Sequence, residues 1–233
     1  MTDRMHAQPP RQVFAVIPAF NEGAAIIDVL RECRRHVDRI VVVDDASSDD
    51  TTQRALMPGV DVLRHPVNLG QGAALQTGIT FALSRGATHV VTLDADGQHD
   101  PAEIGGMLQA MATGNVDVAL GSRFKGAAIG ISPVRRNVLQ LAVLFTRVTT
   151  GLQVTDCHNG FRVFTAAAAR RLRITQNRMA HASEVLEEIA RKRMSYVEVP
   201  VTIRYTDYSM AKGQSSLNSL NILLDLVVHW LRK

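Results

Sequence analysis

At residues 90–101 the chain reads Val-Val-Thr-Leu-Asp-Ala-Asp-Gly-Gln-His-Asp-Pro, an apolar run that ends in two carboxylates, Asp94 and Asp96, before a turn. An unbroken apolar run is expected of a strand buried on both faces of a parallel sheet. Ligands of such sheets gather beyond the carboxyl ends of the strands. Carboxylates there suit Mg²⁺ or Mn²⁺, which take oxygen ligands and keep positions for water and phosphate oxygens. The stretch therefore predicts a parallel α/β sheet with a phosphate-bearing ligand at one edge.

Apolar runs of strand length alternate with helical patterns over the first half of the chain. Strands are expected at 13–17, 40–43, 60–63, 89–93 and 116–120, and helices at 22–36, 70–84 and 101–113. This alternation predicts a doubly wound sheet. The alternation ends after Arg123, where we expect a loop at 126–132, a helix at 134–149, a short strand at 161–164, two helices, and a strand at 196–205 interrupted by Pro200.

Composition favours one globular domain. The chain has 233 residues, of which 46% are hydrophobic and 21% charged. Two cysteines are too few for a disulfide framework, and the first twelve residues lack the apolar core of a signal peptide, so we expect a cytoplasmic protein. The formal charge of +4 fits phosphate substrates or an anionic membrane surface, and we expect no nucleic-acid partner.

The first two expected strands each end in a polar cluster. Asn21 follows the first and is a candidate N-cap of the next helix. Four carboxylates follow the second, and they repel one another unless donors or cations compensate. We interpret Asp49 and Asp50 as capping residues and Asp45 as a ligand-facing residue.

Four stretches together resemble the family 2 glycosyltransferases of the GT-A fold: 16–22, 43–51, 68–72 and 94–99. The similarity extends over residues 13–216 and is strongest to the branch that contains dolichyl-phosphate mannosyltransferase and bacterial polyprenyl-phosphate glycosyltransferases. It implies an α/β fold of GT-A type, a Rossmann-like, mostly parallel central sheet flanked by helices. It also implies an enzyme that uses a nucleotide diphosphate sugar and a divalent cation, Mg²⁺ or Mn²⁺.

The resemblance assigns the donor site residue by residue. Asp45 is the carboxylate expected to bind the base, and Asp94 and Asp96 match the metal motif with Gln98 as a further oxygen ligand. Gly70 begins an expected helix, whose N-terminus would let the backbone approach a diphosphate; the alternative is a glycine turn. Asp94 and Asp96 also belong to the expected nucleotide-sugar site, of which the first wall is Pro18, Phe20, Asn21 and Glu22.

Arginines are expected to bind the acceptor. Guanidinium groups match phosphate oxygens in a bidentate manner, and the resemblance implies that Arg123 and either Arg135 or Arg136 face the acceptor phosphate and the diphosphate. Arg204 and Lys212 belong to a basic segment that resembles the phosphate-closing loop of the same branch.

Glu184 has two readings. It is a general base if the acceptor is a hydroxyl, because a hydroxyl must lose its proton, or a structural partner of an arginine if the acceptor is a phosphate, which is already an anion. Asp156 and Arg162 lie in a stretch similar to the family's Asp-x-x-x-Gly-Phe-Arg segment and are expected to position the sugar or order the loop.

The expected domain organisation has three parts: a tail at 1–12, a glycosyltransferase domain at 13–216 and an amphipathic helix at 217–233. Polar residues recur at helical spacing in the last part, whose length is short of the roughly twenty residues needed to cross a bilayer. We expect it to lie on a membrane surface or to pack on a membrane-protein partner, a second copy or the domain itself.

The resemblance implies an inverting, metal-dependent transfer of a sugar from a donor of the GDP-mannose or UDP-glucose type to a polyprenyl phosphate, on the cytoplasmic face of a membrane. The alternative is transfer to a saccharide hydroxyl in cell-surface polysaccharide synthesis. Catalytic roles fall on Asp96, Arg123 and, under the alternative, Glu184. A nucleotidyltransferase is disfavoured because no glycine-rich, basic triphosphate loop follows the first strand.

Overall fold

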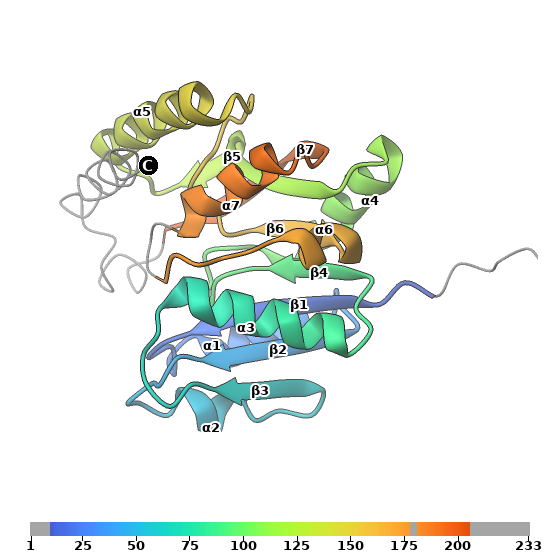
Figure 1. Ribbon diagram of the computed structural model, residues 1–233. Helices are drawn as coiled ribbons and strands as arrows, with labels where there is room; N and C mark the ends of the chain where they lie inside the picture. The colour runs from blue at the N-terminus through green and yellow to red at the C-terminus, as the bar shows by residue number, and fades with distance from the viewer. Residues whose placement is uncertain (1–9, 178–180, 206–233) are drawn as a thin grey trace, which may run out of the picture.

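The computed structural model describes residues 10–177 and 181–205 (Figure 1). Lys212 and the expected helix at 217–233 lie outside the described residues, as does most of the expected N-terminal tail. The elements are β1 (Val13–Ala19), α1 (Ile26–Cys33), β2 (Arg39–Asp44), α2 (Thr51–Ala55), β3 (Val60–Arg64), α3 (Gln71–Ser84), β4 (His89–Thr92), the 3-10 turn η1 (Pro101–Glu103), α4 (Ile104–Gly114), β5 (Val118–Ile129), α5 (Pro133–Thr150), β6 (Arg162–Thr165), α6 (Ala166–Arg171), α7 (His181–Arg191) and β7 (Tyr196–Arg204).

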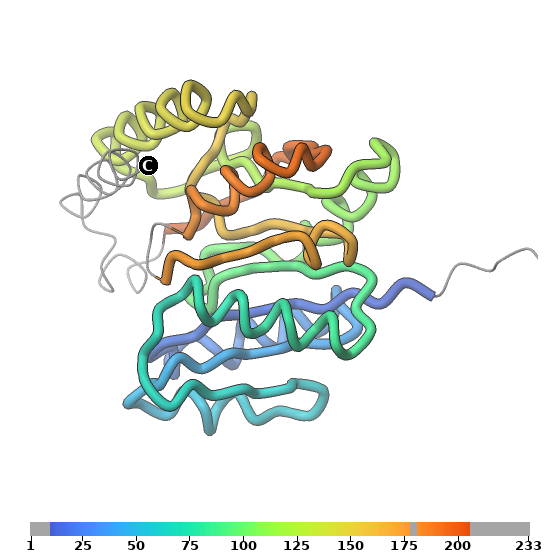
Figure 2. Tube along the Cα trace, viewed as in Figure 1, coloured from blue at the N-terminus to red at the C-terminus, as the bar shows by residue number. Residues whose placement is uncertain are grey.

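The strands form one mixed sheet in the order β3-β2-β1-β4-β6-β5-β7, in which β6 runs antiparallel to both neighbours. The tube in Figure 2 shows the first half of the sequence on the β3 side of the sheet and the second half on the β7 side. The predicted α/β fold with a mostly parallel sheet is confirmed.

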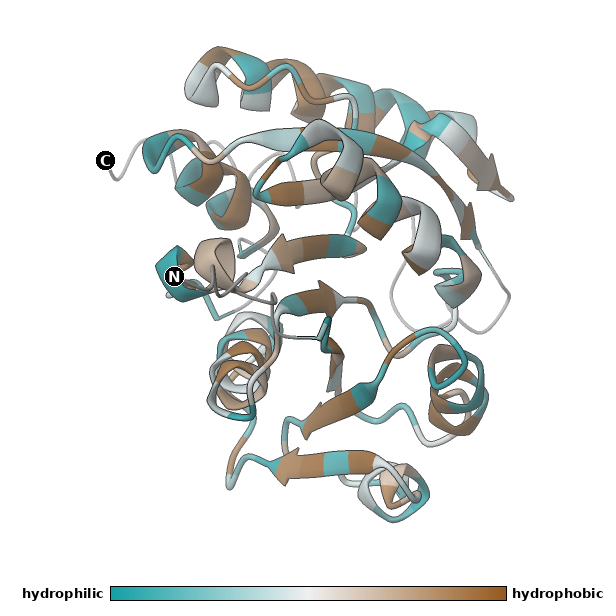
Figure 3. Ribbon diagram, turned by 90° about the vertical axis from the view of Figure 1, so that its right-hand side faces the viewer, coloured by the Kyte–Doolittle hydropathy of each residue, from teal (hydrophilic) through white to brown (hydrophobic). Residues whose placement is uncertain are grey.

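Two hydrophobic clusters cover the two faces of the sheet. Buried side chains of α3, α5, α6 and α7 belong to one cluster, and those of α1, α2 and α4 belong to the other. Figure 3 shows the hydrophobic residues concentrated in the strands between these layers. The central strands read as continuous apolar runs because both of their faces are buried.

Three local predictions from the sequence are wrong. The first helix begins at Ile26 rather than at residue 22, and Asn21 is not its N-cap: Asn21 has φ +55°, and its Oδ1 accepts from Ser48 N at 2.8 Å, so it joins two strand-end loops instead. Residues 126–129 are strand rather than loop, because β5 resumes pairing with β7 after an irregularity between Ser122 and Ala127.

The third wrong prediction is the interruption of the last strand. β7 runs through Pro200, which lies opposite Ser122 at that irregularity. β7 is the edge strand of the sheet, and an edge position at a bulge is where a residue without an N–H is tolerated.

Gly78 sets the distance between α3 and the sheet. A Cβ atom at this position would lie 2.4 Å from Val16 Cγ1 and 3.1 Å from Val43 Cγ2, side chains of β1 and β2. The N-terminus of α3 opens onto the carboxyl ends of these strands, so the same close packing positions Gly70 and Gln71.

We expect Gly78→Ala to lower the free energy of unfolding by about 1–3 kcal/mol, because the added methyl group overpacks the helix–sheet contact. The matched control is Gly106→Ala in α4, where a Cβ meets nothing within 4 Å, and which should raise that free energy by about 0.5–1 kcal/mol. Urea denaturation measures both. Equal effects of the two variants would contradict the packing argument.

Candidate active site

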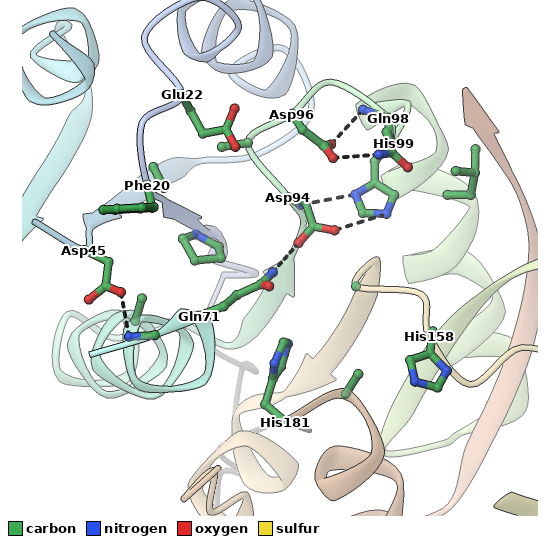
Figure 4. A pocket seen from close by; sticks show the side chains of 18 of the residues that line it. Phe20, Glu22, Asp45, Gln71, Asp94, Asp96, Gln98, His99, His158 and His181 are labelled. Carbon is green, nitrogen blue, oxygen red and sulfur yellow. Dashed lines mark hydrogen bonds and ion pairs between the residues drawn. The ribbon is translucent and has the colours of Figure 1, made fainter. Parts of the chain in front are cut away.

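A cavity of about 610 Å³ opens at the carboxyl ends of β1, β2 and β4 (Figure 4). The parallel register of β1 with β2 and β4 brings the three strand-end loops to one edge of the sheet. Of the residues predicted from the sequence, those that line the cavity are Pro18, Phe20, Glu22, Asp45, Gly70, Asp94, Asp96, Gln98, Arg123 and Arg135.

The carboxylates of Asp94 and Asp96 are the acidic centre of this cavity. Asp94 Oδ1 accepts from Gln71 Nε2 at 2.7 Å, and Asp96 accepts from the backbone N and side-chain Nε2 of Gln98 at 3.0 and 2.7 Å. Burial raises the pKa of Asp94, and burial together with the neighbouring Asp94 raises the pKa of Asp96 to about 6. Glu22 contributes to the raised pKa of both carboxyls, so the site favours an added positive charge.

His99 orients Asp94 without supplying that charge. Its Nδ1 accepts from Asp94 N at 3.2 Å, so the ring proton is on Nε2, which lies 3.9 Å from Asp94 Oδ2. Burial lowers the pKa of His99 to about 4, and the ring is therefore neutral near pH 7. Gly160 lets the main chain pass close to the Asp94 carboxylate, because a Cβ atom at this position would lie 2.9 Å from Asp94 Oδ2.

The donor set fits a hard divalent cation that completes its coordination with ligand oxygens. No group of three His, Cys, Asp or Glu side chains is arranged to hold a metal ion within residues 10–177 and 181–205. Mg²⁺ and Mn²⁺ are commonly held by one or two carboxylates with phosphate and water oxygens in the other positions. The side-chain Nε2 of Gln98 donates to Asp96, so the side-chain oxygen of Gln98 is the atom suited to bind a cation.

Asp45 holds the loop that leads into α3. Its Oδ1 accepts from His65 Nδ1 at 2.7 Å and Leu69 N at 2.9 Å, and its Oδ2 accepts from Gly70 N at 2.6 Å. These bonds use three of the four lone pairs of a carboxylate. One lone pair is thus available for a base N–H, and the loop is ordered before a ligand binds.

The predicted arginines divide by position. Arg123 is buried beside the cavity, where its Nε donates to Asp156 Oδ2 at 2.6 Å. Arg135 also lines the cavity, whereas Arg136 and Arg204 are exposed and are not among its lining residues. The structure therefore distinguishes Arg135 from Arg136, which the sequence left as alternatives.

Glu184 lies outside the set of lining residues. Its carboxylate accepts from Thr175 N at 2.9 Å and Gln176 N at 2.8 Å, which secures the segment before α7. These contacts correspond to the structural reading, with backbone groups in the place of the expected arginine. Asn21 is likewise not among the lining residues.

Three residues that the sequence did not predict as site residues also line the cavity: Gln71, His158 and His181. Gln71 was detectable, because it follows Gly70 at the start of a helix expected at the site. His158 lies just before β6 and His181 begins α7, so the packing of the second half of the chain brings both histidines to the cavity. Burial lowers the pKa of His158 to about 4, so this side chain is neutral in the folded protein near pH 7.

None of the helices in the described part of the chain has the length and hydropathy required to cross a membrane. Residues 14–173 match the model of the family described as "Glycosyl transferase family 2". The chain is 30% identical to a UDP-N-acetylglucosamine–dolichyl-phosphate N-acetylglucosaminyltransferase of Methanococcus voltae, covering 93% of this chain and 95% of that protein. It is 32% identical to an undecaprenyl-phosphate mannosyltransferase of Micrococcus luteus, covering 82% of this chain and 83% of that protein.

Among solved structures, the chain is similar to glucosyl-3-phosphoglycerate synthase from Mycobacterium tuberculosis, crystallised with Mn²⁺, UDP and phosphoglyceric acid. The TM-score is 0.70 at 20% identity, with 93% of this chain and 78% of that chain covered. This likeness bears on the fold alone and confirms the GT-A type. With the family match over most of the chain, these findings identify the protein as an enzyme that belongs to glycosyl transferase family 2.

Proposed function

We propose that this enzyme transfers a hexose from a nucleotide diphosphate sugar to a polyprenyl phosphate, with inversion and with the help of Mg²⁺ or Mn²⁺. The observation that carries the proposal is the presence, in one cavity, of a half-buried acidic pair, Asp94 and Asp96, and two arginines, Arg123 and Arg135. Such a cavity offers separate places for a cation-bound diphosphate and for an anionic acceptor. The named activities of the Methanococcus voltae and Micrococcus luteus relatives support the same acceptor class.

The donor half of the cavity is assigned to the β1, β2 and β4 loops. Asp94, Asp96 and the Gln98 oxygen would hold the cation, which when bound neutralises charge on the departing nucleoside diphosphate. Asp45 would accept from the base, and Phe20, 44% exposed, offers its ring at the entrance. Hydrogen bonds from Leu69 N and Gly70 N to Asp45 hold the segment before α3 in place, which lowers the entropic cost of binding the nucleotide.

The acceptor half is assigned to β5 and α5. Arg123 and Arg135 would hold the phosphate so that its oxygen faces the anomeric carbon, and orientation of this kind lowers the barrier without covalent participation of the protein. The attacking oxygen is anionic, so no general base is needed. The contacts of Glu184 with Thr175 and Gln176 agree with an acceptor of this kind.

The alternative acceptor, a saccharide hydroxyl, would require another base, since Glu184 is not among the lining residues. Asp94 and Asp96 also line the cavity, but they are assigned here to the cation, whereas an anionic phosphate needs no base. Together with the named activities of the two relatives, this favours the phosphate acceptor.

The first test offers the purified protein a panel of GDP- and UDP-sugars with Mg²⁺ or Mn²⁺ and a short polyprenyl phosphate. We expect one donor to give nucleoside diphosphate together with a glycolipid in the organic phase. Transfer only to soluble saccharides would instead establish the alternative acceptor. Polyprenol without its phosphate is the matched control and should not react.

Asp96→Asn should lower kcat at least about 100-fold at saturating cation, because a ligand of the cation is lost. Without cation the Asp96 pKa lies near 6, so protons compete with the cation as the pH falls through this value. Stabilisation of the wild type by Mn²⁺ in a thermal melt should therefore be present at about pH 7.5 and weaken below about pH 6.

Asp100→Asn is the matched control for Asp96→Asn. Asp100 lies in the same loop and accepts from Ala102 N at 3.0 Å, but it is not among the lining residues. An asparagine retains this capping bond, so we expect near wild-type turnover. Full activity of Asp96→Asn at matched cation would refute the assignment of the cation site.

We further propose that α5 contributes to binding at a membrane surface on the cytoplasmic side. Leu141, Leu144 and Val148 are 56%, 59% and 77% exposed and lie at helical spacing on one face, while Leu139 and Val143 are buried on the other. An exposed apolar stripe on a helix with basic residues is the pattern of an interfacial helix. Arg135 lies in the first turns of the same helix, so a membrane bound along α5 would bring a lipid phosphate to the acceptor half of the cavity.

The double variant Leu141→Gln and Leu144→Gln should bind anionic lipid vesicles at least about threefold more weakly in a flotation assay, because apolar area is lost. Leu56→Gln is the control, since Leu56 is 67% exposed but lies at the end of α2, beside the opposite edge of the sheet. Unchanged flotation with a lower mass in sedimentation would assign the stripe to a second copy of the chain.

A further inference from the structure

The two arginines of the cavity converge on one tyrosine, Tyr205, the residue that follows β7. Its hydroxyl oxygen accepts from Arg123 Nη1 at 2.5 Å, and its ring centre lies 5.0 Å from the guanidinium carbon of Arg135. A phenol suits both contacts, because its oxygen accepts hydrogen bonds and its ring face attracts cations. Tyr205 therefore links a cation on β5 to a cation on α5.

The backbone holds Tyr205 in place. Its N–H donates to Ile129 O at 3.0 Å and so continues the β5–β7 ladder beyond the pair Ile129 and Arg204. Gly130, with φ +83°, lets the chain turn toward α5 at this point, and a Cβ there would lie 3.1 Å from Tyr205 O. The sheet thus fixes the backbone from which the Tyr205 side chain extends.

Arg123 is held from three sides. In addition to the bond with Tyr205, its Nε donates to Asp156 at 2.6 Å and its Nη2 donates to His158 O at 2.7 Å. These contacts use three of the five guanidinium N–H groups. Asp156 and the carbonyl oxygen of His158 fix the plane of the Arg123 guanidinium group. The hydroxyl of Tyr205 binds its Nη1 atom, on the side of the cavity where Arg135 lies.

Two guanidinium groups in one cavity repel each other, and this repulsion must be offset before a ligand arrives. Burial lowers the pKa of Arg135, Tyr205 opposes this effect, and Arg123 adds to it. Asp156 forms an ion pair with Arg123, whereas the ring of Tyr205 faces Arg135. The tyrosine thus favours the charged, oriented form of the second arginine.

We propose that Tyr205 is a positioning residue for the acceptor anion, holding Arg123 by its hydroxyl and Arg135 by its ring as one preformed phosphate clamp. The inference rests on the proposed acceptor and deepens it, because it names the group that joins the two cations. It predicts that changes at Tyr205 alter binding of the acceptor phosphate and leave nucleotide binding unaffected.

The test measures binding of farnesyl phosphate, and separately of GDP and UDP with Mn²⁺, to the full chain by titration calorimetry. Tyr205→Phe should weaken farnesyl phosphate binding about tenfold, because a hydrogen bond to a buried charged group is lost. Tyr205→Leu should weaken it further, because the ring contact with Arg135 is lost as well. Affinity for the nucleotides should stay within about twofold of wild type for both variants.

Tyr196→Phe is the matched control. Tyr196 is the first residue of β7, the strand that Tyr205 follows, and its hydroxyl accepts from Gln153 N at 2.8 Å; neither Tyr196 nor Gln153 lines the cavity. We expect it to keep wild-type affinity for both ligands. A thermal melt of each variant separates loss of the clamp from loss of the fold.

The outcomes distinguish this inference from the proposed function. If the wild type binds farnesyl phosphate and Tyr205→Phe binds it equally well, the positioning role is wrong and the acceptor class stands. If both ligand classes weaken together, or Tyr196→Phe behaves like Tyr205→Phe, the effect is structural and the inference fails. If the wild type does not bind farnesyl phosphate, the acceptor class is wrong and the inference is wrong with it.

Discussion

The partial burial of two neighbouring carboxylates, Asp94 and Asp96, beyond the end of β4 is the constraint on which the site depends. Removing a carboxylate from water costs several kcal/mol unless donors or cations replace the solvent. Here Gln71 and Gln98 donate hydrogen bonds to the two carboxylates, and Arg162 offsets part of the charge on Asp94. The raised pKa of both carboxyls shows that this compensation is incomplete, which is the electrostatic condition a divalent cation would relieve.

A second set of buried charges spans the β5–β7 half of the sheet. Glu198 accepts from Thr155 N and Asp156 N, Asp156 binds Arg123, and Arg123 binds Tyr205. Each group forms a hydrogen bond with the next, so Arg123 lies at the cavity as an oriented cation rather than as a mobile surface side chain. The antiparallel strand β6 lies between this set and the acidic pair and joins the two halves of the site.

Many of the residues that line the cavity could be predicted from the sequence because they are local to strand ends. Asp45, Gly70, Asp94, Asp96 and Gln98 each lie within a few positions of an apolar run, and parallel pairing brings such ends together whatever the details of packing. Asn21 was misjudged because its side chain binds a loop that is distant in sequence, at Ser48, instead of its own helix.

The sequence by itself determined the alternation of strands and helices, the mostly parallel sheet and the acidic strand end, since these follow from hydrophobic period and from the chemistry of residues near one another in the chain. Only the tertiary structure decided that Arg135 rather than Arg136 reaches the cavity, that Glu184 secures a loop, and that Tyr205 meets Arg123. Arg123 and Tyr205 are 82 positions apart, and their contact exists only because β5 and β7 pair in one particular register. No local pattern encodes such a register, because it depends on how whole elements pack.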